Sequence, residues 1–392
     1  MKIVLATGIY PPDIGGPATY VECLAREFSE KGNEVRVVTY GGIGLGLGSG
    51  GWKIFWVAKH GGPLVRWWRY SRALKQHAAD ADVVVAFSSV SVGVPLWLSG
   101  LKIPKRILRL GGDFLWERYT DRGGMKGLRE WYNGVTGYWL LVTGLMGRLL
   151  RQFDHIVFST RFQEELYEKQ YRRLSPYSVI ENPSPSPSSS PSSSPSPSPS
   201  PHLAHQPFRL LFMGRFVGFK NLFSLIHSIA GVHELRLREG AAGTDQPQLR
   251  EGEMTLTMVG DGPLKEKLQV VSDQRQAPVA FLPPVSGADK QKIFAEHDLL
   301  VLPSLTEISP NVALEARATG LPVLLTSETG LSEALRQGMI IAKLRTPEEI
   351  RAAIMDVRMR YPEVAKSAGQ TFPERSWQTV AEEYIALFKR LA

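Results

Sequence analysis

Two glutamates in the second half of this 392-residue chain are candidates to accept hydrogen bonds from the hydroxyls of a ligand. Glu307 and Glu315 are separated by seven residues, and Pro310 between them is a residue type favoured in the first turn of a helix. Glu307 is therefore expected in a turn, and Glu315 inside the helix that follows. Acids near the start of a helix also stabilise its dipole, which is the structural alternative for both residues.

The start of that predicted helix is also a candidate phosphate site. Backbone N–H groups in the first turn of a helix have no partner within the helix, and together with the helix dipole they attract anions. The residues expected to line this site are Ser309, Pro310, Asn311 and Val312.

Strands separated by helix-length segments recur in both halves of the chain, which predicts an α/β fold with two parallel sheets. In the first half the predicted strands are Ile3–Thr7, Val35–Tyr40, Val83–Phe87, Ile107–Leu110 and His155–Ser159. In the second half they are Arg209–Phe212, Thr255–Val259, Ala280–Leu282, Leu299–Leu302 and Val323–Thr326. Because parallel sheets bind ligands at the carboxyl ends of their strands, we expect the two halves to face each other across a cleft.

Every residue from Pro183 to Pro201 is proline or serine. Such a segment has no apolar side chains for a core and is expected to be an extended, solvated linker. We therefore expect an N-terminal domain over 1–182, a disordered linker over 183–206 and a C-terminal domain over 207–373. The remaining residues, 374–392, have the apolar spacing of a helix over Trp377–Leu391.

The composition is that of a globular chain, with 43% hydrophobic and 21% charged residues. Cys23 is the single cysteine, and no signal-peptide pattern opens the sequence, so a cytoplasmic protein is expected. The net charge of +8 favours an anionic partner, which could be nucleic acid, acidic lipid or a phosphorylated small molecule. The uncharged stretch Trp131–Gly147 is short for a membrane span, and a buried or interfacial helix is favoured.

Several motifs, in the expected order, resemble those of glycosyltransferase family 4. Glu307, Glu315 and the run Ala316–Val323 match a signature of two glutamates followed by A-x-A-x-G-x-P-V. The other matching residues are Arg215 and Lys220 of the G-R-x-x-x-x-K segment, Gly260, Asp261 and Gly262 of the V-G-D-G-P turn, and Gly15 and Gly16 of the glycine-rich loop after the first strand. One departure is Ile308, where many relatives have a glycine.

The resemblance implies a GT-B fold, in which two Rossmann-like domains face across a cleft and the last helix crosses back to the first domain. It implies a retaining transferase that moves a sugar from a UDP- or GDP-hexose type donor to a glycan or lipid-linked acceptor, with no metal or other cofactor. Arg215 and Lys220 would neutralise the diphosphate as the leaving group gains negative charge. Glu315 would bind the ribose hydroxyls and Glu307 the transferred sugar, while the matching glycines and Asp261 would contact the donor.

Asp113 is the candidate in the first half of the chain. It ends the run Arg109–Asp113, at a strand end where relatives often place a histidine or aspartate near the sugar. A contact with a sugar hydroxyl or with the acceptor is one hypothesis for Asp113. An N-cap of the following helix is the other, because aspartate is a favoured capping residue.

Two further patterns carry weaker signals. The run Gly46–Gly51 fits G-x-G-x-x-G, but it precedes a strand-like segment instead of a helix, so a flexible loop is expected. The segment Trp52–Lys75 has six cations, four tryptophans and no acid. A basic helix beside the acceptor is favoured for it, with peripheral contact to the inner face of the membrane as the next alternative. No nucleic-acid-binding fold signature is present.

Two other functions compete with glycosyl transfer. One is a nucleotide-sugar epimerase of the same fold, and the other is a non-catalytic protein that binds sugar nucleotides. The presence of Arg215, Lys220, Glu307 and Glu315 together favours the transferase. The sequence leaves the donor base, the acceptor and the oligomeric state open.

Overall fold

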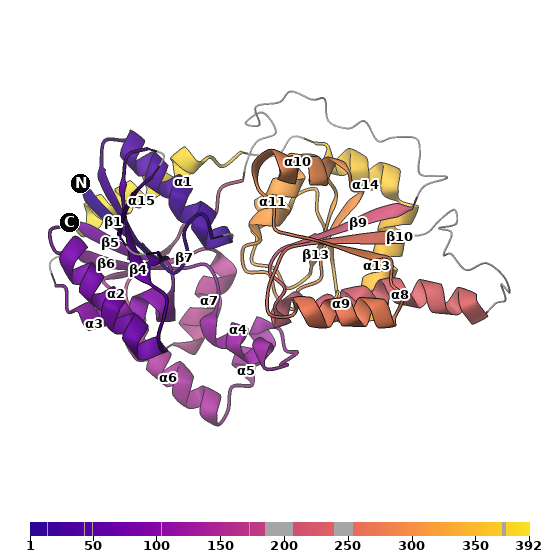
Figure 1. Ribbon diagram of the computed structural model, residues 1–392, viewed down its shortest axis with the longest axis horizontal. Coiled ribbons are helices and arrows are strands. Elements are labelled where there is room, and N and C mark those ends of the chain that lie inside the picture. Colours follow the sequence, from indigo (N-terminus) through magenta and orange to yellow (C-terminus); the bar gives the residue numbers. More distant parts are fainter. Residues whose placement is uncertain are drawn as a thin grey trace. The chain divides into compact units, whose positions relative to one another are not determined.

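A computed structural model describes residues 1–13, 15–42, 44–48, 50–102, 104–171, 173–184, 207–238, 254–370 and 374–392. The chain forms two compact units, each built on its own sheet (Figure 1). The first unit contains Met1–Arg118, Arg129–Pro183 and Arg375–Ala392, and the second contains Tyr119–Leu128 and Ser184–Glu374. The predicted linker lies outside the described residues, apart from Pro183 and Ser184.

The first unit has an eight-stranded sheet with the order β3-β4-β2-β1-β5-β6-β7-β8. All neighbouring strands are parallel except β3 and β4, which are antiparallel. The central strands β1 and β5 are buried, apart from Lys2 at the start of β1, because helices cover both faces of the sheet. The strand bounds are β1 Lys2–Thr7, β2 Glu34–Gly41, β3 Gly44–Leu47, β4 Lys53–Ala58, β5 Val83–Ala86, β6 Lys105–Leu110, β7 His155–Phe158 and β8 Tyr177–Val179.

Helices α1 (Gly16–Glu30) and α15 (Trp377–Leu391) lie on one side of this sheet (Figure 1). Helices α2 (Pro63–His77), α3 (Val94–Ser99) and α6 (Tyr138–Leu150) lie on the other side, as right-handed crossovers require. The remaining helices of this part are the π-helix η1 (Ser89–Gly93), α4 (Phe114–Asp121), α5 (Leu128–Asn133) and α7 (Arg161–Gln170).

The last helix of the chain contributes to the core of the first unit. Tyr384 and Phe388 of α15 are fully buried. Phe388 packs against Phe28 of α1 with ring centroids 5.7 Å apart, and Tyr384 meets the same ring edge-on at 6.2 Å. Aromatic pairs at these separations stabilise a core beyond the area that they bury.

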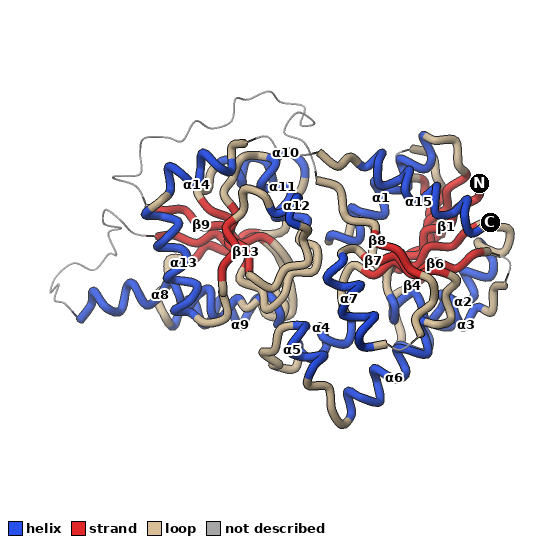
Figure 2. Tube along the Cα trace, turned by 180° about the vertical axis from the view of Figure 1, so that it is seen from behind, coloured by secondary structure: helices blue, strands red, loops and turns tan. Residues whose placement is uncertain are grey.

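The second unit has a six-stranded, fully parallel sheet with the order β11-β10-β9-β12-β13-β14. Figure 2 shows strands of this sheet, among them β9 and β13, with helices around them. Its strands are β9 Phe208–Met213, β10 Met254–Val259, β11 Val279–Leu282, β12 Leu299–Leu302, β13 Val323–Thr326 and β14 Ile340–Ala342. Its helices are the 3-10 helix η3 Gly218–Lys220, α8 Leu222–Arg238, α9 Lys265–Gln274, α10 Gly287–Ala295, α11 Asn311–Ala318, α12 Glu333–Arg336, α13 Pro347–Met359 and α14 Tyr361–Ala368.

The two α/β units with parallel sheets confirm the predicted fold class. The expectation of a flexible loop over Gly46–Gly51 is wrong for its first part, because Gly44–Leu47 forms strand β3. This exposed edge strand is held by antiparallel pairing with β4, where Gly46 lies opposite Ile54. A glycine is needed there because a Cβ on Gly46 would lie 2.9 Å from the indole nitrogen of Trp56.

The segment Tyr119–Leu128, which the expected N-terminal domain included, belongs instead to the second unit. The backbone N–H of Leu128 donates to Thr306 Oγ1 (2.8 Å). Gly218 lies so close to this segment that a Cβ on it would be 2.4 Å from the carbonyl oxygen of Thr120. These tertiary contacts place the segment in the second unit, although in the sequence it lies between two parts of the first unit.

The uncharged stretch over Trp131–Gly147 is divided between helices α5 and α6. The break falls at Gly137, which begins α6 with a φ of 56°, a left-handed conformation that favours glycine. One side of α6 is buried, and the other exposes Leu141 and Leu145. Across the described ranges, no helix has both the length and the apolar character needed to cross a bilayer.

Candidate active site

The candidate donor site is built on three adjacent, parallel strands of the second unit, β10, β9 and β12. Because the carboxyl ends of parallel strands meet at one edge of a sheet, the loops after these strands lie side by side. They carry Gly260–Gly262, Gly214–Lys220 and Pro303–Pro310. The N–H of Leu305 donates to the carbonyl oxygen of Phe219 (2.8 Å), which joins the last two loops.

The glycines predicted in the V-G-D-G-P turn are required by packing between two of these loops. A Cβ on Gly260 would lie 1.9 Å from the carbonyl oxygen of Gly214, and a Cβ on Gly262 would lie 2.6 Å from that of Phe216. The carboxylate of Asp261 accepts the N–H of Gly262 within its own turn (2.9 Å). This close approach of the two loops explains why both positions are glycine, and no contact with a ligand is needed to explain it.

Lys220 and Glu307, predicted as separate contacts to the donor, form an ion pair. Lys220 Nζ lies 2.5 Å from Glu307 Oε1, and the Ser304 hydroxyl donates to the same oxygen at 2.5 Å. The backbone of Glu307 is fixed as well, because its N–H donates to the Glu328 carbonyl (2.9 Å) and its carbonyl accepts from Gly330 (2.8 Å). The carboxylate is thus held rigidly at the strand end.

Helix α11 begins four residues after Glu307, as the sequence predicts. Its N-cap is Pro310, no side chain caps it, and no acid lies in its first turn. The Ser309 hydroxyl is buried without a hydrogen-bond partner among the described residues. Such a group costs about 1–3 kcal/mol, which an anion bound at the start of the helix would offset. Asn311 and Val312, half-buried, form the first turn, and Pro310 is buried behind it.

Glu315 lies inside α11 and is half-buried. Its carboxylate forms an ion pair with Lys290 of α10, whose ammonium also lies 5.9 Å from the ring centroid of Phe294. Sequence reasoning missed Lys290, because nothing in its spacing from Glu315 signals the contact between the two helices. The pair holds the Glu315 carboxylate in one position.

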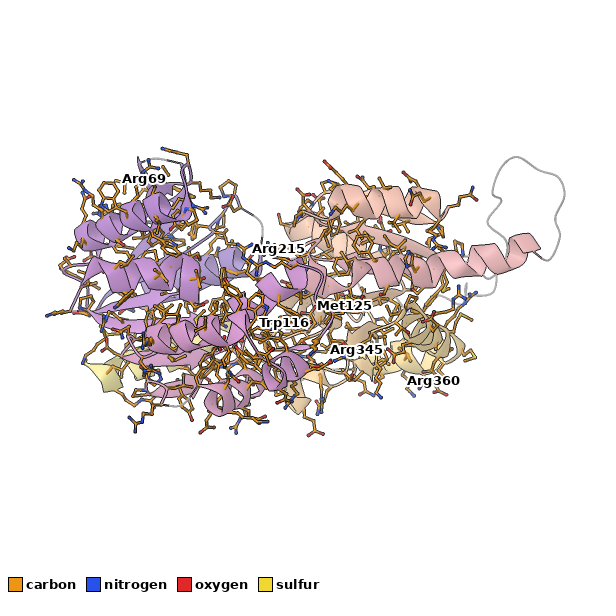
Figure 3. All side chains as sticks on the ribbon, turned by 90° about the horizontal axis from the view of Figure 1, so that it is seen from below. Arg69, Trp116, Met125, Arg215, Arg345 and Arg360 are labelled. Atoms are coloured by element: carbon orange, nitrogen blue, oxygen red, sulfur yellow. The ribbon has the colours of Figure 1, made fainter. Side chains whose placement is uncertain are left out.

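Arg215, labelled in Figure 3, is exposed. Its guanidinium makes no hydrogen bond or ion pair with any described residue. It shares the loop after β9 with Lys220, whose charge is instead shielded by Glu307. Arg215 therefore keeps all of its donors available for an incoming anion. Among the described residues, no group of three or more His, Cys, Asp and Glu side chains is placed to hold a metal ion.

Asp113, in the first unit, is the N-cap of α4, which confirms the capping alternative. Its Oδ1 accepts the N–H of Trp116 (2.9 Å), and its Oδ2 accepts the hydroxyls of Tyr132 (2.5 Å) and Tyr167 (2.9 Å). The residue is 1% exposed. Burial raises its pKa, against the opposing effect of these hydrogen bonds. With both oxygens engaged and no access from solvent, Asp113 has no contact left to offer a sugar in this structure.

Gly15 and Gly16 form the start of α1 in the first unit. Gly15 is the N-cap and Gly16 the first helical residue, and no side chain caps this helix. A Cβ on Gly15 would lie 3.0 Å from Cδ1 of Ile9, so local packing favours glycine there. The start of α1 is left open to solvent at Gly16 and Pro17.

Asn221, which directly follows the G-R-x-x-x-x-K segment, is a supporting residue that the sequence pattern did not indicate. It adopts a left-handed φ of 55°, and its side-chain amide donates to the carbonyls of Leu344 (3.0 Å) and Arg345 (3.1 Å). Asparagine tolerates this conformation better than most residues. It ends the loop that carries Arg215 and Lys220 and fixes it to the loop after β14.

Comparison with known proteins finds matches over both halves of the chain. Residues 207–358 match the family described as glycosyl transferases group 1, and residues 15–183 match the glycosyl transferase 4-like domain. The D-inositol 3-phosphate glycosyltransferase of Geodermatophilus obscurus is 33% identical over 118 residues, which are 29% of this chain and 25% of that enzyme. The curated relatives that come first in similarity match this chain over only 25–36% of their own length.

Two solved structures cover essentially the whole chain. Sucrose-phosphate synthase from Thermosynechococcus elongatus aligns with a TM-score of 0.74 at 15% identity, over 100% of this chain and 99% of that one. The Anabaena HepE protein in complex with UDP and glucose aligns with a TM-score of 0.68 at 15% identity, over 100% of both chains. At this identity the likeness concerns the fold. Taken together, the two matched segments and the two parallel-sheet units make this chain a GT-B member of the glycosyl transferases group 1, glycosyltransferase family 4.

Proposed function

We propose that this glycosyltransferase moves a hexose from a UDP- or GDP-type donor to a glycan or lipid-linked acceptor, on the cytoplasmic side and with retention of configuration. The observation that carries the proposal is the set of groups at one edge of the second sheet. Adjacent loops carry Arg215, which has no partner within the described ranges, the Lys220–Glu307 pair and the uncapped start of α11. The complex of the HepE protein with UDP and glucose supports a nucleotide-sugar as the donor.

Each group has a role that follows from its charge. Arg215 binds the diphosphate through the N–H donors of its planar guanidinium, and Lys220 supplies a second positive charge. The Ser309 hydroxyl and the start of α11 donate to phosphate oxygens. Glu315, held by Lys290, accepts the two ribose hydroxyls, and Glu307 accepts hydroxyls of the sugar.

The transfer breaks one bond and forms one. The bond between the sugar C1 and the phosphate oxygen breaks, and its electron pair stays on the nucleoside diphosphate. The acceptor oxygen bonds to C1 on the face that the phosphate leaves, and the acceptor proton passes to the departing phosphate oxygen. Arg215, Lys220 and the helix dipole stabilise the negative charge that develops there, so no metal is needed in this scheme.

A direct same-face displacement is preferred here over a double displacement. A double displacement needs a free carboxylate as the nucleophile. Glu307 is bonded to Lys220 and Ser304, and Asp113 is buried with both oxygens engaged. A covalent sugar trapped on either residue would overturn this preference. The epimerase alternative is not favoured by the relatives, which are transferases.

A thermal-shift screen against UDP, GDP, ADP and CMP and their sugars tests the proposal. Ligand that binds only the folded chain raises the melting temperature with the logarithm of its excess. We expect a shift with UDP or GDP that is lost in Glu315→Ala and kept in Glu333→Ala, an acid of α12 that the site does not use. The matching sugar donor, incubated with candidate acceptors, should then release the nucleoside diphosphate. The absence of a shift with any nucleotide would favour a non-catalytic role.

A further inference from the structure

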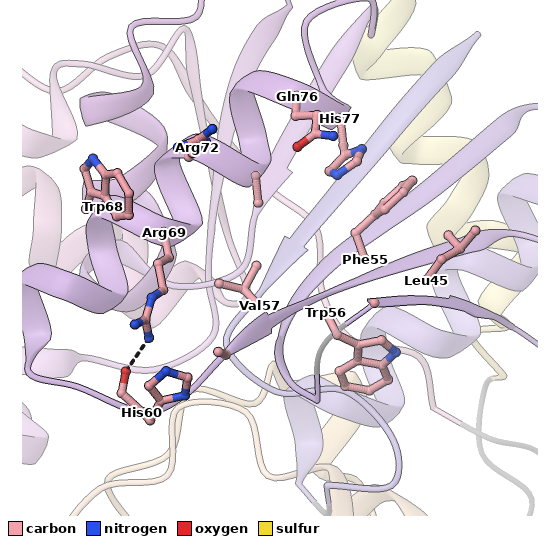
Figure 4. Close-up of a pocket in the computed structure, with 13 residues that line it drawn as sticks. Leu45, Phe55, Trp56, Val57, His60, Trp68, Arg69, Arg72, Gln76 and His77 are labelled. Carbon is pink, nitrogen blue, oxygen red and sulfur yellow. Dashed lines mark hydrogen bonds between the residues drawn. The ribbon is translucent and has the colours of Figure 1, made fainter.

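A groove in the first unit lies between strand β4 and helix α2. It shares no residue with the proposed donor site. It encloses about 580 Å³ (Figure 4). Cationic and aromatic side chains line it, and none of the lining residues that the structure describes is acidic. The side chains that matter here are Arg69, Arg72, Trp56, Trp68 and His60.

The outer surface of α2 continues this groove with exposed apolar side chains. Leu64 is 76% exposed and Trp68 is 61% exposed, and Val65 lies between them. Trp68 also lines the groove, and the guanidinium of Arg72 lies 5.9 Å from its ring centroid. Exposed apolar groups therefore lie in the first half of α2, and cations recur along the whole helix as far as Lys75.

The same composition extends to the neighbouring helices on this side of the sheet. Helices α3 and α6 lie on the same side of the sheet as α2 (Figures 1 and 2). Helix α3 exposes Trp97 and Leu98, and α6 exposes Leu141 and Leu145 before Arg148. The sequence contains no Asp or Glu over 59–79, 83–112 or 134–153. Soluble monomers rarely expose a broad apolar surface without a partner for it.

From this surface we infer that the α2–α3–α6 side of the first unit docks on an anionic membrane. The groove cations Arg69 and Arg72 bind lipid phosphates. The side chains of Leu64, Val65 and Trp68 insert at the boundary between the headgroups and the acyl chains. Membrane-surface helices combine a basic side with Trp and Leu in this way. A cation near an anionic leaflet contributes about 1 kcal/mol of attraction.

Two other occupants fit the surface less well. A second copy of the chain, meeting this side through two-fold symmetry, would bring the cations of both copies together with no acid to pair them. A nucleic acid would use the cations but would leave Leu64, Leu98, Leu141 and Leu145 in water. Only an anionic bilayer uses both kinds of side chain.

Vesicle sedimentation of the full chain tests the inference. We expect binding to vesicles that contain phosphatidylglycerol, little binding to phosphatidylcholine alone, and release at high salt. The variant Arg72→Gln/Lys75→Gln should bind roughly ten- to thirty-fold more weakly, since two attractive charges are lost. The variant Leu64→Ser/Trp68→Ser should also bind more weakly, and the binding that remains should be released at lower salt.

The control is Arg26→Gln/Lys389→Gln, which removes the same charge from exposed positions on α1 and α15, on the other side of the sheet. It should bind like the natural chain. Equal loss in this control, binding to phosphatidylcholine alone, or release by excess glycerol phosphate would each overturn the inference. The last outcome would indicate a small-molecule phosphate site. Melting temperatures and the nucleotide-induced shift should be unchanged in all three variants, which separates a failure here from a failure of the proposed function.

Discussion

Lys220 and Glu307 form a largely buried ion pair between the loops that follow two adjacent strands, and their side chains are 14% and 5% exposed. Removing one partner from a buried pair leaves an uncompensated charge, which costs about 3–5 kcal/mol. Lys220→Met should therefore lower the free energy of unfolding of the second unit by about that much, as measured by urea denaturation. The double variant Lys220→Met/Glu307→Leu should recover most of the loss while remaining inactive. Unchanged stability in Lys220→Met would mean that the pair is not formed in solution.

Replacing Arg215 should lower activity and leave stability nearly unchanged, because its guanidinium has no partner among the described residues. Arg215→Ala should change stability by no more than about 0.5 kcal/mol. It should lower kcat by about 10²–10³ if it stabilises the leaving diphosphate. Arg215→Lys should restore part of the rate, since it keeps the charge but not the forked geometry. Equal activity in Arg215→Ala would remove this residue from the proposed site.

Gly260 fixes the distance between two loops of the site, and Gly260→Ala should be strongly destabilising. The added Cβ would meet the carbonyl oxygen of Gly214 at 1.9 Å, and Gly260 has a φ of 153°. We expect a loss of more than about 1 kcal/mol, read from the melting temperature of the second unit. The control Gly144→Ala lies on the exposed side of α6 with nothing within 4 Å of its Cβ, and should stabilise its helix by about 0.5–1 kcal/mol. A tolerated Gly260→Ala would show that the two loops can separate.

The strands were predictable wherever a continuous apolar run was bounded by turn residues. Leu299–Leu302 and Val323–Thr326 have the predicted bounds for this reason. Gly44–Leu47 was missed because an exposed, glycine-rich edge strand has no buried face to give a periodic signal. The motifs at strand ends predicted that the candidate donor-site residues would meet at one edge of the second sheet. Lys290 and the two tyrosine hydroxyls that donate to Asp113 could not be predicted, since tertiary packing alone brings them to their partners.

Asp113 should make the stability of the first unit fall as pH rises. Burial holds its folded-state pKa above the ordinary value of about 3.9. Below that value the folded and unfolded chains both carry the proton, and the favourable contribution is fully present. As pH rises through the folded-state pKa, this contribution is lost, because the carboxylate is charged in a buried site. We expect the melting temperature of the natural chain to fall relative to Asp113→Asn from about pH 4 upward.

Asp80 provides a control of opposite sign on the same unit. Hydrogen bonds from Arg36 and Lys2 hold its pKa well below the ordinary range. Its contribution is present above the unfolded-state pKa and is lost as pH falls, so the natural chain should lose its advantage over Asp80→Asn in acid. Melting curves of the three proteins over the same pH series should therefore diverge in opposite directions. A flat difference curve for Asp113→Asn would mean that the tyrosine hydroxyls and the Trp116 N–H offset the burial of the carboxylate completely.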